Sequence, residues 1–182
     1  FKKETERRIN KTINDLGTLK FEFTTHQIDK ELSQCITYKK LQYKRSCSPD
    51  PLKNDTEQNL LFHLSHQSSP SFRGVVSTLY AGDHWLASHI GIINNTVMHY
   101  WFPVYNPKFI EYSPGRILIV KMIEDAKNQG LKFFDFGAGT SQMKRKFSNS
   151  ERTLVKGVLR NQHIYAFLFQ AYQSVKWRIK TY

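Results

Sequence analysis

The stretch Tyr112–Ser148, YSPGRILIVKMIEDAKNQGLKFFDFGAGTSQMKRKFS, decides the fold. Ser113 is a favoured helix N-cap and Pro114 a favoured first helical residue. Gly130 is a typical helix stop, and the apolar run Lys132–Phe136 after it is typical of a buried strand. Between these signals, apolar residues recur at helical spacing at Leu118, Ile119, Met122, Ile123 and Ala126. The stretch therefore predicts a capped helix followed by a strand.

The predicted helix, over residues 115–129, begins at a glycine beside the predicted sheet. Helix N-termini present free N–H groups and a positive pole, which favour a bound anion. Ser113, Gly115 and Arg116 are therefore candidate ligands for a pyrophosphate, and Lys121 adds positive charge. An ordinary capped helix packed on a sheet explains the same residues, so both interpretations stay open.

Strands are predicted immediately before this helix, because β-branched and apolar runs are separated by turn signals at Gly82-Asp83 and Asn94-Asn95. The predicted strands cover Phe72–Tyr80, His84–Ile93 and Thr96–Tyr105. They are expected to form an antiparallel meander, with Lys132–Phe136 added next to the third strand. The chain contains no Walker phosphate loop, because no Gly-Lys-Ser/Thr follows its glycines.

Other segments complete the predicted order of elements. Helical periodicity marks residues 3–16, Asp29–Lys44, Thr56–His66 and Ile164–Ile179. Strands are predicted over Thr18–Phe23 and Thr153–Leu159, and a polar loop over Gly137–Ser150. The expected fold class is therefore α/β (α+β), a mixed, mainly antiparallel sheet flanked by helices, in one domain over residues 1–182.

The amino-acid composition limits the kinds of partner that the chain can bind. The net charge of +12 implies a polyanion, a phosphate-bearing ligand or an anionic surface, without choosing among them. The two cysteines, Cys35 and Cys47, form no C-x-x-C pair, which favours structural free thiols over a disulfide, and no metal site is expected. There is no apolar run of about 18 residues, so no membrane span is expected. No nucleic-acid-binding motif is recognisable.

Several motifs together resemble a known family. They are Trp85–Ile93 (WLASHIGII), Tyr105–Pro107 (YNP), Ser113–Gly115 (SPG) and Phe134–Phe147 (FDFGAGTSQMKRKF). The chain resembles, over about residues 5–165, the C-terminal domain of the CelD/BcsL acetyltransferase family. That family belongs to the GNAT superfamily and is related to the Fem peptidoglycan aminoacyltransferases. The resemblance implies a GNAT-like fold that forms the C-terminal half of a longer two-domain protein.

The resemblance also implies a function. We expect a cytoplasmic N-acyltransferase that moves an acyl group from acyl-CoA, with acetyl-CoA as first choice, to an amine in envelope or exopolysaccharide metabolism. Its partners would be the acyl-CoA donor, an amine-bearing acceptor and the N-terminal half. One alternative is a Fem-like transferase that uses aminoacyl-tRNA. Another is an inactive GNAT-like module that serves as a binding domain.

Acyl transfer to an amine needs a base and a donor of a proton to the leaving thiolate. Asp135 lies between two phenylalanines, where burial would raise its pKa and suit a base, but a structural carboxylate is equally expected. His89 lies in an apolar strand, where a core histidine is more common than a base. Tyr105, at a strand end, is either a proton donor or a core aromatic. Lys144, after the glycine loop, is a candidate to bind the donor or to pair with Asp135.

Two positions depart from the family pattern. The family usually has Asp where this chain has Asn106, and Tyr where it has Met143. The usual GNAT loop, Q/R-x-x-G-x-G/A, is also absent. If the missing Asp or Tyr carries proton transfer or acceptor binding, these departures favour the inactive module.

Overall fold

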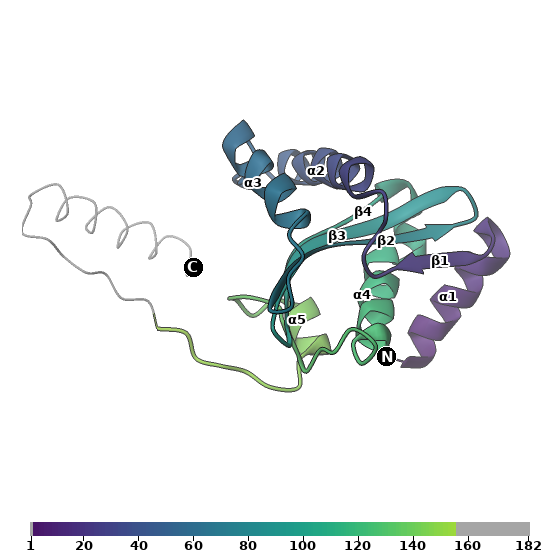
Figure 1. Cartoon of the computed structure of the whole chain (residues 1–182). Helices are drawn as coiled ribbons and strands as arrows, with labels where there is room; N and C mark the ends of the chain where they lie inside the picture. The colour runs from purple at the N-terminus through teal and green to yellow at the C-terminus, as the bar shows by residue number, and fades with distance from the viewer. Residues whose placement is uncertain (1, 156–182) are drawn as a thin grey trace, which may run out of the picture. The chain divides into compact units, whose positions relative to one another are not determined.

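The computed structural model describes residues 2–155 (Figure 1). The chain forms two compact units, Phe1–Gly139 and Thr140–Tyr182. The first unit holds the sheet, and the described part of the second holds one short helix, α5 (Gln142–Phe147). The expected organisation, a single domain that is the C-terminal half of a longer protein, stays a prediction.

A five-stranded sheet in the order β1-β2-β3-β4-β5 forms the centre of the first unit. Its strands are β1 (Leu19–Glu22), β2 (Phe72–Ala81), β3 (His84–Asn94), β4 (Val97–Tyr105) and β5 (Phe133–Asp135). Neighbours from β1 to β4 are antiparallel, whereas β5 is parallel to β4. The predicted meander, and the predicted place of the last strand beside its third member, are both confirmed.

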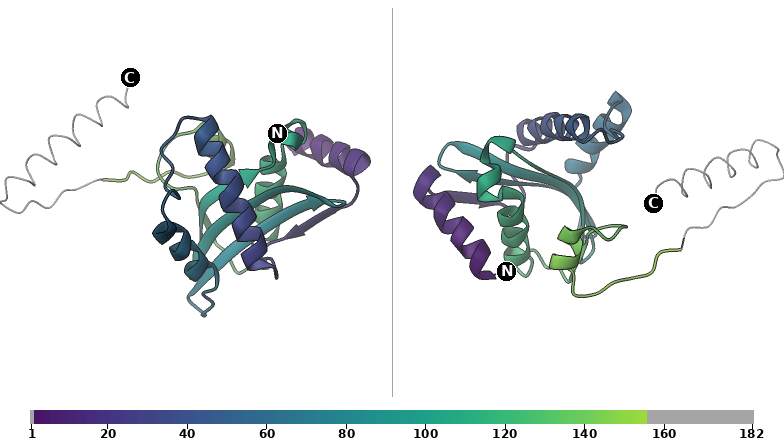
Figure 2. Two further views of the ribbon diagram at one scale, coloured as in Figure 1. Left: turned by 90° about the horizontal axis from the view of Figure 1, so that it is seen from above. Right: turned by 180° about the vertical axis from the view of Figure 1, so that it is seen from behind.

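Helices cover both faces of this sheet (Figures 1 and 2). One face carries α2 (Ile28–Arg45) and α3 (Asp55–Ser65), and the other carries α1 (Lys2–Leu16) and α4 (Pro114–Asp125). A short 3-10 helix, η1 (Pro107–Tyr112), joins β4 to α4. The predicted mixed sheet flanked by helices is therefore correct.

Apolar side chains fix α2, α3 and α4 on the sheet. Under α2 and α3 the buried cluster includes Leu32, Cys35, Ile36, Leu61, Trp85, Ile90 and Val104. On the opposite face α4 buries Ile117, Leu118, Ile119 and Met122. Burial of such side chains contributes about 1.5–3 kcal/mol each, so the sheet is held from both sides.

The start of α4 differs from the prediction in one respect. Pro114 is the first helical residue, as predicted, but the side chain of Ser113 caps nothing. Ser113 has φ of +56°, and its backbone carbonyl accepts the N–H groups of Arg116 (2.9 Å) and Ile117 (3.2 Å). The helix then ends at Asp125, before Gly130, whose φ of +70° completes the turn into β5.

Two further predictions are wrong. Phe133 in β5 is 55% exposed, because β5 is an edge strand that pairs only with β4. Within the predicted loop 137–150, residues 142–147 form α5, since the Ser141 side chain accepts the N–H of Lys144 and caps a helix. The predicted strand Thr153–Leu159 is described only over 153–155, which form no strand, and the predicted helix Ile164–Ile179 lies outside the described residues.

One histidine belongs to the core. His89 on β3 is fully buried, and its ring stacks on Tyr100 of β4 with centroids 4.2 Å apart and planes 5° apart. Neither ring nitrogen has a hydrogen-bond partner in the described part of the chain. Burial, assisted by the charge of Lys39, lowers the pKa of His89 to about 3. The histidine is therefore neutral at physiological pH.

A substitution at Gly74 tests how closely α3 packs on β2. A β-carbon on Gly74 would lie 2.2 Å from the carbonyl oxygen of Leu64 and 2.4 Å from Cα of Ser65, which are backbone atoms. We expect Gly74→Ala to lower the free energy of unfolding by about 1–3 kcal/mol. Urea denaturation measures this. Gly115→Ala is the matched control, since its β-carbon meets only Cδ1 of Tyr105, at 3.8 Å, and equal losses in both variants would contradict the packing.

The buried histidine predicts a pH-dependent stability. Because the pKa of His89 falls from 6.5 in the unfolded chain to about 3 in the fold, the unfolded state binds more protons between these values. Stability is therefore complete above about pH 6.5 and falls as the pH drops toward 3, by up to about 1.4 kcal/mol per pH unit. In urea unfolding, the His89→Phe variant should lack this pH-dependent part of the stability. The control His63→Gln, at an exposed site, should retain it. Identical pH slopes for wild type and His89→Phe would refute the assignment.

Candidate active site

The parallel pairing of β4 with β5 is short. It covers three residue pairs, Val97 with Phe133, Met98 with Phe134 and His99 with Asp135. Beyond His99, residues 100–105 of β4, apart from Trp101, still pair with β3 but have no strand partner on the β5 side among residues 2–155. We call the point of separation the fork. An unpaired strand edge offers backbone N–H and C=O groups to a ligand.

Two irregularities mark β4 just past the fork. The register shift between Ile90 and Gly91 leaves Trp101 opposite no residue of β3, and Trp101 is 42% exposed. Such a bulge redirects side chains and is common next to binding sites. Pro103 lacks an N–H and is tolerated because this segment is an edge on the β5 side.

The N-terminus of α4 lies at the end of β4. Pro114 has no N–H, and the N–H of Arg116 is bonded to Ser113 O. The N–H of Gly115 has no hydrogen-bond partner among the described residues. Of the backbone donors predicted for this site, it is therefore the one that is available to a ligand. This open donor lies at the positive pole of the helix.

Tyr105 flanks this donor. A β-carbon on Gly115 would lie 3.8 Å from Cδ1 of Tyr105, so ring and glycine are in contact range. No described residue bonds the Tyr105 hydroxyl. The structure therefore brings four predicted site residues, Tyr105, Ser113, Gly115 and Arg116, to one end of the sheet.

Asp135 occupies the fork itself, but in a different environment from the predicted one. Its side chain is 52% exposed, so the expected burial is wrong. One carboxylate oxygen accepts the N–H of Gly137 at 2.7 Å, which is the structural alternative foreseen from the sequence. The other lies 3.4 Å from Nδ1 of His99. A carboxylate that faces Nδ1 of a histidine orients its imidazole ring.

Sequence reasoning missed His99. Its side chain is 31% exposed and it forms the last residue pair before the fork. No local motif marks it, since its meeting with Asp135 depends on a parallel register between segments 36 residues apart. Of the remaining predicted site residues, His89 is buried under Tyr100, and Lys144 lies on α5, in the second unit. A part for Lys144 in donor binding stays a prediction.

Asn106, which departs from the family pattern, has a structural role. It is 8% exposed, and its amide donates to Trp85 O at 3.4 Å while its Oδ1 accepts the N–H of Lys108 at 3.1 Å. Its backbone N–H also bonds Leu86 O at 2.8 Å. A carboxylate at this position would have no proton to donate to Trp85 O. The side chain thus ties the end of β4 to β3.

Helix α2 fixes the same part of β4 from the face it covers. Lys39 is 7% exposed, and its ammonium donates to Pro103 O at 2.8 Å. Burial lowers the pKa of Lys39. The thiol of Cys35, whose pKa burial raises, lies 3.8 Å from Phe102 O. These contacts hold the segment just beyond the fork against α2.

No group of three or more His, Cys, Asp or Glu side chains in residues 2–155 is placed to hold a metal ion. Cys35 and Cys47 are both free thiols. None of the described helices is long and apolar enough to cross a membrane.

Known structures share this fold. A predicted acetyltransferase with acetyl-CoA from Clostridium acetobutylicum is 12% identical with a TM-score of 0.55, covering 80% of this chain and 100% of that one. An aminoglycoside acetyltransferase from an uncultured soil metagenomic sample, in complex with trehalose, is 12% identical with a TM-score of 0.54, covering 82% and 99%. Glucosamine-6-phosphate N-acetyltransferase from Arabidopsis thaliana is 14% identical with a TM-score of 0.50, covering 77% and 98%. At these identities the similarity establishes the fold.

The sequence itself establishes the family. No curated protein matches the chain significantly. The model of the acetyltransferase (GNAT) domain, however, matches residues 2–145, which include β1 to β5, the fork and the start of α4. The chain therefore belongs to the GNAT acetyltransferase domain family.

Proposed function

We propose that this domain transfers an acetyl group from acetyl-CoA to a primary amine, in the cytoplasm. The observation that carries the proposal is the fork, where an unpaired β4 edge runs toward the open N–H of Gly115. The finer assignment to the CelD/BcsL family, with a role in envelope or exopolysaccharide metabolism and an N-terminal partner half, rests on the sequence resemblance. The acetyl-CoA complex of the Clostridium acetobutylicum protein with the same fold supports the choice of donor.

The residues present suit such a donor. The Gly115 N–H at the positive pole of α4 would hold a phosphate oxygen, with Arg116 beside it. The free edge of residues 100–105 would hold the extended, amide-containing arm that leads to the thioester. When bound, acetyl-CoA supplies an activated acyl carbonyl. The chain's net charge of +12 favours a donor that carries phosphates.

His99, at the fork, would handle the proton of the acceptor amine. His99, oriented by Asp135, accepts the proton that the acceptor's ammonium loses before its nitrogen attacks the thioester, directly or through one water. Tyr105 lies six residues from His99 along β4, about 20 Å at 3.3 Å per residue, so its hydroxyl would bond the phosphate end of the donor beside Gly115, and the leaving thiolate takes its proton from water. His89 is not assigned a role in proton transfer, because its ring nitrogens are shielded by the core. Asn106 is committed to the β4 end, so its difference from Asp does not by itself argue for an inactive module.

Gly115→Glu tests the donor site. The new side chain places bulk and negative charge where we expect a phosphate, so acetyl-CoA affinity should fall by at least about tenfold, or 1.4 kcal/mol. Isothermal titration calorimetry measures the affinity, and Gly115→Ala is the control that keeps the site open. Unchanged affinity in a cooperatively folded Gly115→Glu protein would remove the site. Tight tRNA binding without any response to acetyl-CoA would favour the Fem-like alternative, and no response to either would favour the inactive module.

Substitution of the His99–Asp135 pair tests proton transfer. We expect His99→Gln to lower kcat by about 10²–10⁴-fold, since no group then accepts the amine proton, and Asp135→Asn to lower it less while changing the pH profile of kcat/KM. Initial rates of thiol release across a pH series measure both, with an aliphatic amine as trial acceptor. Glu124→Gln, an exposed carboxylate variant on α4, is the control. Normal turnover in His99→Gln would return the pair to a structural role.

A further inference from the structure

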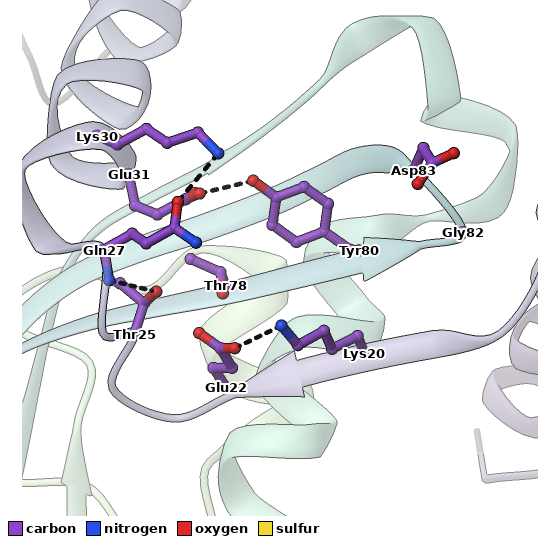
Figure 3. Close-up of a pocket in the computed structure, with 10 residues that line it drawn as sticks. All are labelled: Lys20, Glu22, Thr25, Gln27, Lys30, Glu31, Thr78, Tyr80, Gly82 and Asp83. Carbon is purple, nitrogen blue, oxygen red and sulfur yellow. Dashed lines mark hydrogen bonds and ion pairs between the residues drawn. The ribbon is translucent and has the colours of Figure 1, made fainter.

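A cavity of about 310 Å³ lies away from the fork, between the start of α2 and strands β1 and β2 (Figure 3). It is on the face of the sheet that α2 covers, whereas Gly115 belongs to α4 on the opposite face (Figure 2). Its lining is almost entirely polar, with five charged side chains, Lys20, Glu22, Lys30, Glu31 and Asp83.

Glu31 is the unusual member of this lining. It is only 3% exposed, and its Oε1 accepts the Tyr80 hydroxyl at 2.6 Å. Its Oε2 is shielded from solvent and has no hydrogen-bond partner among the described residues. A buried carboxylate oxygen without a donor is costly, so the site lacks one N–H or O–H group. Burial, together with the bond to Glu31, raises the pKa of Tyr80, which keeps the hydroxyl protonated as a donor.

The other charges in the cavity are distributed unevenly. Lys20 and Glu22 neutralise each other at 2.8 Å, and the Lys30 ammonium donates to the amide oxygen of Gln27 at 3.2 Å. Asp83, at the β2–β3 turn, has no ion-pair partner in the described part of the chain. Glu31 and Asp83 thus form no ion pair within the described residues, although the charge of Glu31 adds to the rise in the pKa of Lys20. In Figure 3 the ring of Tyr80 lies between them.

We infer that this cavity binds a small aliphatic amine, whose primary ammonium group donates to Oε2 of Glu31. The ligand enters by displacing the exposed Gln27 side chain, which lies beside Glu31 (Figure 3). An aliphatic chain then lies along the Tyr80 ring, and a second ammonium, where the ligand has one, faces Asp83. Ammonium–carboxylate hydrogen bonds of this kind are short and about twice as strong as neutral ones.

This site is distinct from the reaction site of the proposed function. β3 separates β2 from β4, and strands are about 4.8 Å apart, so an amine held over β2 lies about 10 Å from β4. Its nitrogen therefore cannot be the one that reacts at the fork. The inference needs no acetyl-CoA and survives a failure of the proposed function.

Calorimetric titration of the full chain with putrescine, without acetyl-CoA, tests the site. We expect saturable one-to-one binding, and a rise of about 3–6 °C in Tm when putrescine is present at ten times its Kd. 1,4-Butanediol, which has the same length but no charge, should not bind. Glu31→Gln keeps the side-chain shape and the acceptor for Tyr80 but removes the charge, and should weaken binding by at least about tenfold. Glu57→Gln on α3 is the matched control and should bind like wild type.

Each other outcome overturns the inference. No binding of putrescine by wild type excludes the site, and equal binding of butanediol shows that the ammonium is not recognised. Equal affinity in Glu31→Gln and wild type places the amine elsewhere. If Glu31→Gln fails to fold, Asp83→Asn at the exposed turn decides, because it should weaken putrescine severalfold while leaving methylammonium, which cannot span to the turn, unaffected. Unchanged putrescine affinity in Asp83→Asn then rejects the site.

Discussion

The candidate active site depends on the point at which β5 stops pairing with β4. The Asp135 carboxylate helps to set that point, because it accepts the N–H of Gly137 two residues ahead and so turns the chain away from the ladder. Gly137 has φ of +70°, a conformation that glycine adopts without strain. The same carboxylate faces His99 on β4. One side chain therefore ends the strand and orients the imidazole at the opening that this ending creates.

A free strand edge is useful only if the strand keeps its shape without the missing neighbour. β4 does so because it is fixed from its other edge and from one face. The β3 ladder pairs it up to Tyr105, Lys39 holds the Pro103 carbonyl, and Asn106 anchors its end to Trp85. Burying the Lys39 ammonium has a desolvation cost, visible in its lowered pKa. That cost is offset by the hydrogen bond to the Pro103 carbonyl, which fixes this part of β4 against α2.

Local patterns predicted the elements well and their environments less well. Turn signals and apolar periodicity located the meander and the helix after Pro114, because both depend on neighbouring residues. The Ser113 cap was wrong because that residue adopts a positive φ and its carbonyl takes over the capping role. The predicted burial of β5 was wrong because an apolar run does not tell a central strand from an edge strand. The sequence did not reveal His99, because its contact with Asp135 depends on the parallel register of β4 and β5. It did not reveal Glu31 either, because the absence of a hydrogen-bond donor for its Oε2 depends on the tertiary structure.

The two proposed ligands carry opposite charges, so the positive net charge of the chain affects their binding in opposite ways. The net charge of +12 attracts phosphates over long distances, so the open N–H of Gly115 needs to add only orientation. The same net charge repels a protonated amine over long distances. Only at short range do the carboxylates of Glu31 and Asp83 make the interaction attractive. Salt screens the long-range field over about 8 Å at physiological ionic strength but affects a buried pair much less. Rising salt should therefore weaken binding of a phosphate-bearing donor while weakening amine binding less, since screening also removes the repulsion.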